Sequence, residues 1–453
     1  MFIKKKVLNT DNCSNKVGLL LCGDNVLSRF AIAIASLCSG TSCIKNISVN
    51  EKVINLIEQL KQLGVDIKQD GENIIINGKG LYGFQQPRNI IDIKDSKKNL
   101  LLMLILVANQ DFKTFITGSD DFVLKDFSFI YNYLENINIV FNSDEHLPLL
   151  CYGKRGFLQH SSFTVEDCFD KGVLLLSSIF NKKNTVLSDK DLQDETVENI
   201  LKHFGVDISE KYYETTNFLT RTTKKCKEIV VNKNKTGMLE GKNLEIPANL
   251  KDTFYCIIAF LLTNNEEIVI KNVMVNELND DIIKLLIENG VDLQFRNQRV
   301  INEIKVSDLI IKRSELKPLS VSKERTKKVV DYYPFVILLN LLKNNSFKVF
   351  NAKYLKEKDK ENYLFTLQFA KQLGFELVEN KDELEFVAKD NFELPKNNIN
   401  IVDKLEPTMQ LAVLLAGICC DGKIECNCNI KEIKDIFTDF DKMLSKLNLT
   451  CNE

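Results

Sequence analysis

A helix-and-strand pattern that occurs six times along the chain restricts the possible folds more than any other feature of the sequence. Within each copy, apolar residues recur at i, i+3, i+4 and i+7, which predicts an amphipathic helix. Gly or Asn then marks the end of the helix, and a short alternating stretch predicts a strand. The six copies lie at residues 56–67, 131–140, 197–208, 282–293, 365–377 and 441–450.

A second, more apolar helix followed by a strand precedes each copy, so the repeating unit is helix, strand, helix, strand. This first helix is apolar nearly all round, which predicts burial on every side. Because one core seldom extends beyond about 250–300 residues, six units predict two domains of three units each. We therefore expect an α/β fold, a two-domain inside-out α/β barrel with buried helices and outer sheets. The polar stretch 209–245 predicts a domain boundary.

The charge balance and the hydropathy of the chain exclude two classes of partner. The 60 basic and 62 acidic side chains leave a formal charge of −2, and no basic arm or nucleic-acid motif is present. Nucleic-acid binding is therefore not expected. The most apolar run, residues 100–108, is far shorter than the roughly 20 residues that cross a bilayer. We expect no membrane partner.

The cysteines and the beginning of the chain indicate a cytoplasmic protein. The first residues carry lysines but no apolar run of the kind found in secretory signals. Thirteen cysteines, an odd number, fit reduced thiols better than a disulfide framework. The closest set is Cys419, Cys420, Cys426 and Cys428, and all three histidines lie far from it in sequence. We expect these to be buried apolar cysteines, without a metal.

Several segments, in a fixed order, carry a resemblance to a known family. Residues 23–47, GDNVLSRFAIAIASLCSGTSCIKNI, match a Gly-Asp-x-x-x-Ser opening followed by an Ala-rich helix and Gly-Thr-x-x-Ile-x-Asn. Further matches follow at 147–156, 167–176, 195–208, 246–262, 329–339, 354–362 and 411–417. In this order the sequence resembles the 5-enolpyruvylshikimate-3-phosphate (EPSP) synthase family of enolpyruvyl transferases. The resemblance implies a first domain of residues 1–21 plus 247–453 and a second domain of residues 22–246.

The resemblance also implies a reaction. The enolpyruvyl group of phosphoenolpyruvate is transferred to the 5-hydroxyl of shikimate 3-phosphate, and phosphate is released. Two phosphorylated substrates need fixed Arg and Lys side chains, and the addition and elimination steps need a carboxylate and a lysine to move protons. No metal or organic cofactor is implied, and we expect a monomer.

Some residues of that chemistry are present at the matching positions. As catalytic residues the resemblance implies Asp331, Lys358 and Asp359. As substrate-binding residues it implies Ser28, Arg29, Lys97, Lys98, Lys125 and Lys171. Several of them also have a structural explanation: Asp331 precedes a predicted helix that it would cap, Lys358 lies in a charge-rich run typical of a solvated face, and Ser28 lies at a helix start.

Many of the family's anion-binding residues are replaced. Asn25, Phe30 and Asn362 stand where the family has Lys or Arg, and Pro407-Thr408 stands for its late His-Arg pair. The loop 95–101 lacks the family's Gly and Arg, and Asp167 occupies a phosphate-binding position. Losing one charged partner of a desolvated phosphate costs about 2–5 kcal/mol. We therefore expect the family activity to be weak, altered or lost. Two alternatives stay open: a divergent but active synthase, and a non-catalytic interaction or scaffold protein.

Overall fold

The computed structural model divides the chain into two compact units. Unit 1 comprises Met1–Leu21, Ala248–Arg299 and Lys305–Glu453, and unit 2 comprises Cys22–Pro247 and Val300–Ile304. The structure describes residues 1–5, 16–133, 138–155, 162–165, 168–190, 192, 195–217, 222–233, 238–275, 281–326, 328–358, 360–380, 382–388, 399–401, 405–419 and 424–452.

Unit 2 contains three sheets with the same topology. In each sheet the first two strands are parallel and the remaining neighbours are antiparallel. The first sheet has the order β14 (Leu244–Glu245), β3 (Ser39–Lys45), β5 (Asn73–Lys79), β4 (Asp66–Asp70). The second has β6 (Ile91–Asp92), β7 (Lys113–Thr117), β9 (His146–Tyr152), β8 (Ile139–Ser143). The third has β10 (Ser162–Val165), β11 (Thr185–Asp189), β13 (Thr222–Val231), β12 (Ile208–Asn217).

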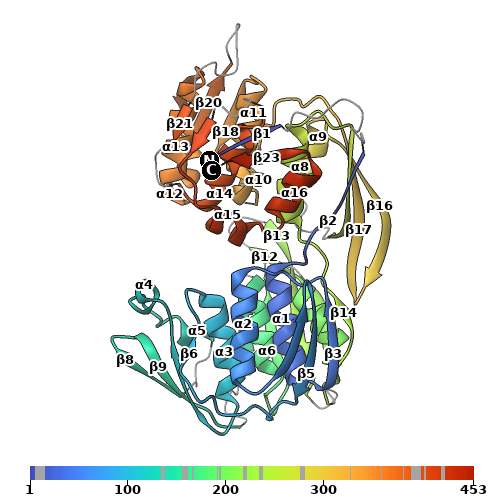
Figure 1. Ribbon diagram of the computed structural model, residues 1–453, viewed down its shortest axis with the longest axis vertical. Helices are drawn as coiled ribbons and strands as arrows, with labels where there is room; N and C mark the ends of the chain where they lie inside the picture. The colour runs from blue at the N-terminus through green and yellow to red at the C-terminus, as the bar shows by residue number, and fades with distance from the viewer. Residues whose placement is uncertain are drawn as a thin grey trace. The chain divides into compact units, whose positions relative to one another are not determined.

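Three apolar helices form the core of unit 2 (Figure 1). They are α1 (Asn25–Leu37), α3 (Lys97–Ala108) and α6 (Cys168–Ser178), and most of their residues are buried. The second helices of the repeats, α2 (Glu51–Gln62) and α7 (Thr196–His203), bury one face only, as their sequence periodicity predicts. The middle repeat has the short helices α4 (Asp120–Val123) and α5 (Ile130–Tyr133).

Unit 1 repeats this arrangement with less regular sheets. Its first sheet has the order β16 (Asp292–Ile301), β17 (Ile304–Lys312), β15 (Glu267–Met274), β2 (Lys16–Leu20). Its second has β18 (Phe347–Phe350), β20 (Glu383–Val387), β19 (Glu376–Asn380). Two strand pairs complete it: β21 (Ile399–Ile401) with β22 (Ile424–Cys426), and β1 (Phe2–Lys5) with β23 (Leu449–Asn452).

The core of unit 1 is again made by three apolar helices, α8 (Leu250–Leu261), α11 (Tyr333–Leu342) and α14 (Pro407–Ala416). Packed beside them are the remaining helices of the unit. These are α9 (Asp281–Glu288), α10 (Lys323–Thr326), η1 (Val330–Tyr332), α12 (Ala352–Lys358), α13 (Lys360–Gln372), α15 (Ile430–Ile436) and α16 (Phe440–Lys446). The buried helices with sheets around them confirm the predicted inside-out α/β fold.

The two segments that connect the units exchange strands. Strand β2 comes directly before α1 in sequence, but it pairs in parallel with β15 of unit 1. Strand β14 comes directly before α8, but it pairs in parallel with β3 of unit 2. Each unit therefore obtains its outermost parallel strand from the segment that leads into the other unit.

The boundary predicted from the polar stretch 209–245 is wrong. Strands β12 and β13 occupy most of this stretch and pair along their whole length, from Ile208 with Val231 to Asn217 with Thr222. Their polar side chains belong to a long hairpin with a solvated face, not to a linker. The division observed in the structure falls instead between Leu21 and Cys22 and between Pro247 and Ala248. Within the described residues, no helix is both long enough and apolar enough to cross a membrane.

Gly23 lies where the two connecting segments pass each other at the edge of unit 2. Its N–H donates to Asn46 O at 2.9 Å, and the next N–H, of Asp24, donates to Pro247 O at 2.9 Å. A Cβ at this position would lie 2.2 Å from Asn46 O and 2.5 Å from Ile246 Cγ2, so only glycine fits without a shift of the backbone.

Gly23→Ala is therefore expected to destabilise the protein by about 1–3 kcal/mol, the usual cost of forcing extra volume into a packed site. Urea unfolding followed by circular dichroism measures the change. Gly18→Ala is the matched control, since nothing lies within 4 Å of a Cβ built there. Equal unfolding midpoints for the two variants would contradict this account of Gly23.

Candidate functional site

The start of α1 places the predicted residue Ser28 beside the helix cap Asp24, and both make contacts within unit 2. Asp24 caps the helix by accepting from the N–H of Leu27 at 2.7 Å. Ser28 is fully buried; its Oγ donates to Asp24 O at 2.7 Å and accepts from the N–H of Ser48 at 3.0 Å. The hydroxyl of Ser28 thus joins the helix start to the segment after β3, and its predicted contact with substrate gains no support from this position.

Arg29 is only 2% exposed and connects α1 to α3. Its Nη1 donates to Asn99 Oδ1 at 3.2 Å, and its Nε donates to Asn25 O at 3.4 Å. Asn99 is itself held by Ser96, which caps α3. Burial lowers the pKa of Arg29 to about 10, and the nearby carboxylate of Asp24 opposes that shift. The guanidinium stays charged at neutral pH and fastens the N-terminal ends of two core helices together.

Three of the four predicted lysines of unit 2, Lys97, Lys98 and Lys125, are exposed and lie over aromatic rings. Lys97 Nζ is 3.8 Å from the ring centroid of Phe129, and Lys125 Nζ is 5.2 Å from that of Phe122. Both rings contact Phe127, so one aromatic cluster carries the two ammonium groups. Such cation–π contacts leave an exposed ammonium group accessible to an anion.

Lys98 lies on a second set of rings. Its Nζ is 4.9 Å from the centroid of Phe169 at the start of α6, and Phe169 contacts Phe30 of α1 at 5.3 Å. Helices α1, α3 and α6 therefore bring Arg29 and Lys98 to the same end of the unit 2 core. Aligned helix N-termini favour negative charge, so an anion is the ligand class that this end of the core suits. Asp167, predicted to oppose an anion here, lies outside the described residues.

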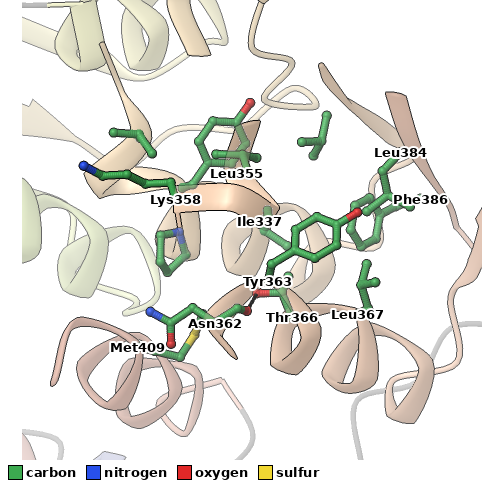
Figure 2. A pocket seen from close by; sticks show the side chains of 14 residues that line it. Ile337, Leu355, Lys358, Asn362, Tyr363, Thr366, Leu367, Leu384, Phe386 and Met409 are labelled. Atoms are coloured by element: carbon green, nitrogen blue, oxygen red, sulfur yellow. Dashed lines mark hydrogen bonds between the residues drawn. The ribbon is translucent and has the colours of Figure 1, made fainter. Parts of the chain in front are cut away.

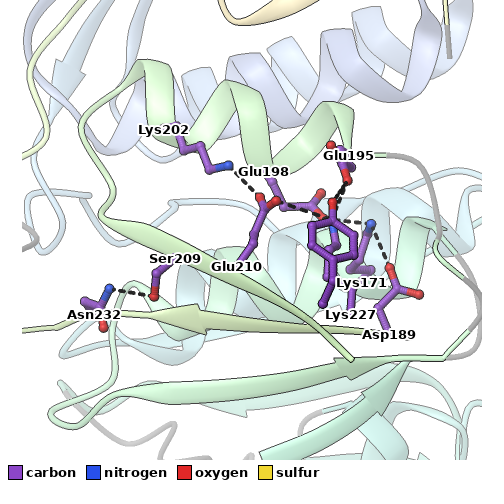
Figure 3. Close-up of polar contacts among 10 residues, drawn as sticks. Lys171, Asp189, Glu195, Glu198, Lys202, Ser209, Glu210, Lys227 and Asn232 are labelled. Carbon is purple, nitrogen blue, oxygen red and sulfur yellow. Dashed lines mark hydrogen bonds and ion pairs between the residues drawn. The ribbon is translucent and has the colours of Figure 1, made fainter. Parts of the chain in front are cut away.

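Lys171 occupies the interior of unit 2 instead of its surface. Its Nζ lies 2.7 Å from Glu198 Oε1 and 3.3 Å from Asp189 Oδ2, and all three side chains are fully buried. Lys227 lies 3.4 Å from the same Glu198 oxygen and 2.9 Å from Glu195 (Figure 3). These residues form a buried charge cluster between α6, α7 and the third sheet. The predicted contact of Lys171 with substrate stays a prediction that this position does not favour.

The electrostatics of the buried charge cluster follow from burial and pairing. Burial raises the pKa of Glu198, although Lys171 and Lys227 pull it down. Burial by itself would lower the pKa of Lys227, but Glu198, Glu195 and Glu210 raise it to about 12. Removing one partner of such a set leaves an uncompensated charge in a low dielectric, which is far more costly than losing a surface ion pair.

Three members of this cluster, Asp189, Glu195 and Lys227, were not predicted from the sequence. Asp189 and Lys227 are cross-strand neighbours in β11 and β13, and Glu195 precedes α7. The one signal for them was Lys227 itself, a lysine close to the apolar strand residues 229–231. That signal is weak without the strand register, because lysines normally lie on exposed faces.

Asp331 is the first predicted catalytic residue of unit 1. It is exposed and lies in the one-turn helix η1, directly before α11. The structural explanation offered for it is wrong, because the N-cap of α11 is Tyr332 and not Asp331. Its carboxylate affects the buried Tyr255 of α8. Burial raises the pKa of Tyr255, and the negative charges of Asp252 and Asp331 add to this shift.

Lys358, the last residue of α12, lines a pocket inside unit 1 (Figure 2). The pocket encloses about 520 Å³ of empty space, part of it open to solvent. Val330 and Tyr333, which lie on either side of Asp331 in sequence, also line it. The structure thus brings Lys358 and the chain around Asp331 to one apolar pocket. Asp359 lies outside the described residues.

Comparisons with a family model and with individual relatives point to the same family. The family model described as EPSP synthase (3-phosphoshikimate 1-carboxyvinyltransferase) matches residues 13–447. A 3-phosphoshikimate 1-carboxyvinyltransferase from Petrotoga mobilis is 25% identical over 450 residues, which cover 98% of this chain and 99% of the relative. The protein of the same name from Oceanobacillus iheyensis is 24% identical and covers 84% of this chain and 85% of its own.

The fold is also similar to solved structures. A structure of EPSP synthase from Acinetobacter baumannii superposes with a TM-score of 0.81 at 17% sequence identity, over 97% of both chains. At that identity the superposition supports the fold and not the details of the site.

Lys227→Met is expected to destabilise the protein by about 3–5 kcal/mol, because it leaves Glu198 and Glu195 with one cation fewer inside unit 2. The raised pKa of Lys227 also fixes the pH dependence: its contribution is complete below the ordinary lysine pKa of 10.5 and is lost as the pH rises towards about 12.

Urea unfolding at pH 8 and at pH 11 measures both effects, with the exposed Lys225→Met on the same strand as control. The stability difference between wild type and Lys227→Met should be smaller at pH 11. If the stability loss of Lys227→Met equals that of Lys225→Met, or if it grows with pH, the stabilising positive charge of the cluster does not lie on Lys227.

Proposed function

The chain belongs to the EPSP synthase family, and on this premise we propose that it transfers the enolpyruvyl group of phosphoenolpyruvate to shikimate 3-phosphate slowly and with weak binding of both substrates. Phosphate is the second product. The weak binding, rather than the class of reaction, is what distinguishes this proposal from the ordinary activity of the family.

The main support for weak substrate binding is that half of the candidate binding residues are buried. Ser28, Arg29 and Lys171 are at most 2% exposed, and each has partners inside unit 2. A charge that is already paired with an internal carboxylate, as in Lys171, contributes little to a bound phosphate. Anion binding then depends on Lys97, Lys98 and Lys125, whose ammonium groups are single, flexible charges without the bidentate geometry of arginine.

Proton transfer is assigned to Asp331 and Lys358. Asp331 is exposed and does not cap α11, so its carboxylate is available as a base. No salt bridge is found for Lys358 among the described residues, so its ammonium group is available as an acid. A carboxylate and an ammonium group of this kind are what an addition followed by an elimination requires.

The alternative of a fully active, divergent synthase has one observation in its favour. Lys97 and Lys125 lie on the same aromatic cluster, and Lys98 lies at the end of the core where α1, α3 and α6 meet. In this alternative the three lysines supply the cations of a phosphate clamp in place of the missing arginines.

Phosphate release by the purified full-length protein, given phosphoenolpyruvate and shikimate 3-phosphate, tests the proposal. We expect slow release that needs both substrates and that half-saturates well above the micromolar range, which corresponds to roughly 8 kcal/mol of binding. Asp331→Ala should lower the rate about a hundredfold or more. Lys358→Gln should also lower it, whereas Lys356→Gln, two residues earlier on α12, is the matched control and should not.

Two outcomes would contradict the proposal. Saturation at micromolar substrate, abolished by Asp331→Ala, would establish the fully active synthase. No release, together with no thermal shift by either substrate, would mean that the fold serves a non-catalytic purpose.

A further inference from the structure

The outward face of α13, a helix of unit 1, carries a leucine between two surface hollows (Figure 1). Spacings of three and four residues place four side chains in one stripe along this face: Glu361, Leu364, Gln368 and Lys371. Leu364 is 47% exposed. A single exposed leucine is ordinary on a protein surface. Leu364 is different because, together with Gln368, it lines both hollows, which therefore form one groove along the helix.

The first hollow lies between α13 and the beginnings of α14 and α15, and we call it the acidic hollow. It has a volume of about 780 Å³ and is open to solvent. Phe365 and Leu405, each 7% exposed, give it an apolar base. Its charged lining residues are Glu361 of α13, Glu406 directly before α14 and Glu432 of α15. No basic residue lines it in the part of the chain that the structure describes.

The three carboxylates of the acidic hollow are not neutralised within the described part of unit 1. No ion pair is found there for Glu361, Glu406 or Glu432. The two hydrogen bonds that Glu432 accepts come from neutral amides, Gln410 Nε2 at 3.3 Å and Asn429 Nδ2 at 3.1 Å. Three like charges around one hollow favour a ligand that brings positive charge.

The second hollow continues along α13 and has the opposite charge. It has a volume of about 570 Å³, and the half-buried Leu367 lines it beside Leu364. Its one charged lining residue is Lys371, which is exposed and has no ion pair among the described residues. Glu361 and Lys371 are ten positions apart, which corresponds to about 15 Å along a helix. The groove is thus negative at one end, apolar in the middle and positive at the other end.

We propose that this groove binds an amphipathic helix of a partner protein. Basic side chains at one end of the partner helix lie in the acidic hollow, aliphatic side chains cover Leu364, and an acidic side chain at the other end meets Lys371. The apolar middle supplies affinity, and the two charged ends select the partner and fix its position. A small cation would satisfy the carboxylates but would leave Leu364 in water, so a helix of about three turns fits the groove better.

Fluorescence anisotropy with a labelled peptide and the purified protein, without substrates, tests the proposal. The probe is a helical peptide of about 15 residues with glutamate in its first turn, leucines on one face and two lysines in its last turn. We expect saturable binding with a dissociation constant in the micromolar range, as is usual for a small, transient interface. A control peptide with both lysines replaced by glutamate should bind at least tenfold more weakly.

Substitutions on the protein separate the apolar and the charged contributions. Leu364→Ala should weaken binding of the probe about fivefold to tenfold, because it removes part of the apolar contact. Glu361→Lys and Glu406→Lys should each weaken it about fivefold through the reversed charge. Glu376→Lys is the matched control, since Glu376 is an exposed glutamate of β19 outside the groove, and it should bind as wild type does. All four positions are exposed, so these variants should fold.

Several results would overturn the proposal. They are the absence of saturable binding, equal binding of the two peptides, a Leu364→Ala variant that binds as wild type does, and a Glu376→Lys variant that loses as much affinity as Glu361→Lys. Sedimentation of the protein alone should give the mass of one chain. A dimer that Leu364→Ala dissociates would mean that a second copy occupies the groove, which also contradicts the proposal. Because no substrate is present, these results do not depend on whether the protein releases phosphate.

Discussion

Burial of six apolar helices is the constraint on which the rest of the structure depends. Helices such as α3 and α11 are apolar on every side, so neither a single sheet nor one partner helix can cover them. In each unit, three such helices pack on one another and the sheets close around them. The parallel helices then begin at one end of the core, and that geometry gathers the charged residues of the first turns.

Some of the charged side chains near these helix starts hold the core together. Arg29 connects α1 to α3, and Lys171 of α6 forms ion pairs with Glu198 and Asp189. A charged side chain at these positions stabilises the fold whether or not a substrate binds. The presence of Arg29 or Lys171 is therefore weak evidence of activity. An exposed group such as Asp331, which does not cap its helix, is stronger evidence.

Periodicity predicted the architecture well and the site poorly, for physical reasons. Apolar spacing reports which side of a helix is buried, so it identified the six repeats and the inside-out arrangement before any contact was known. It failed at residues 209–245, where β12 and β13 are polar because one face of their hairpin is solvated. The burial of Lys171 depends on Asp189 and Glu198, which come close to it only because distant elements pack together, so no local sequence pattern predicts this burial.

The pairing of β1 with β23 has a consequence for the order in which the units fold during synthesis. Phe2 lies opposite Asn452, so β1 stays without its partner strand until β23 has been synthesised. Unit 2, by contrast, is complete as soon as β14 has emerged, apart from residues 300–304. Vectorial synthesis therefore favours folding of the inserted unit first, while the strands of residues 2–5 and 16–20 stay unpaired and exposed to wrong partners. These two short strands must therefore avoid other partners until β15 and β23 have been synthesised.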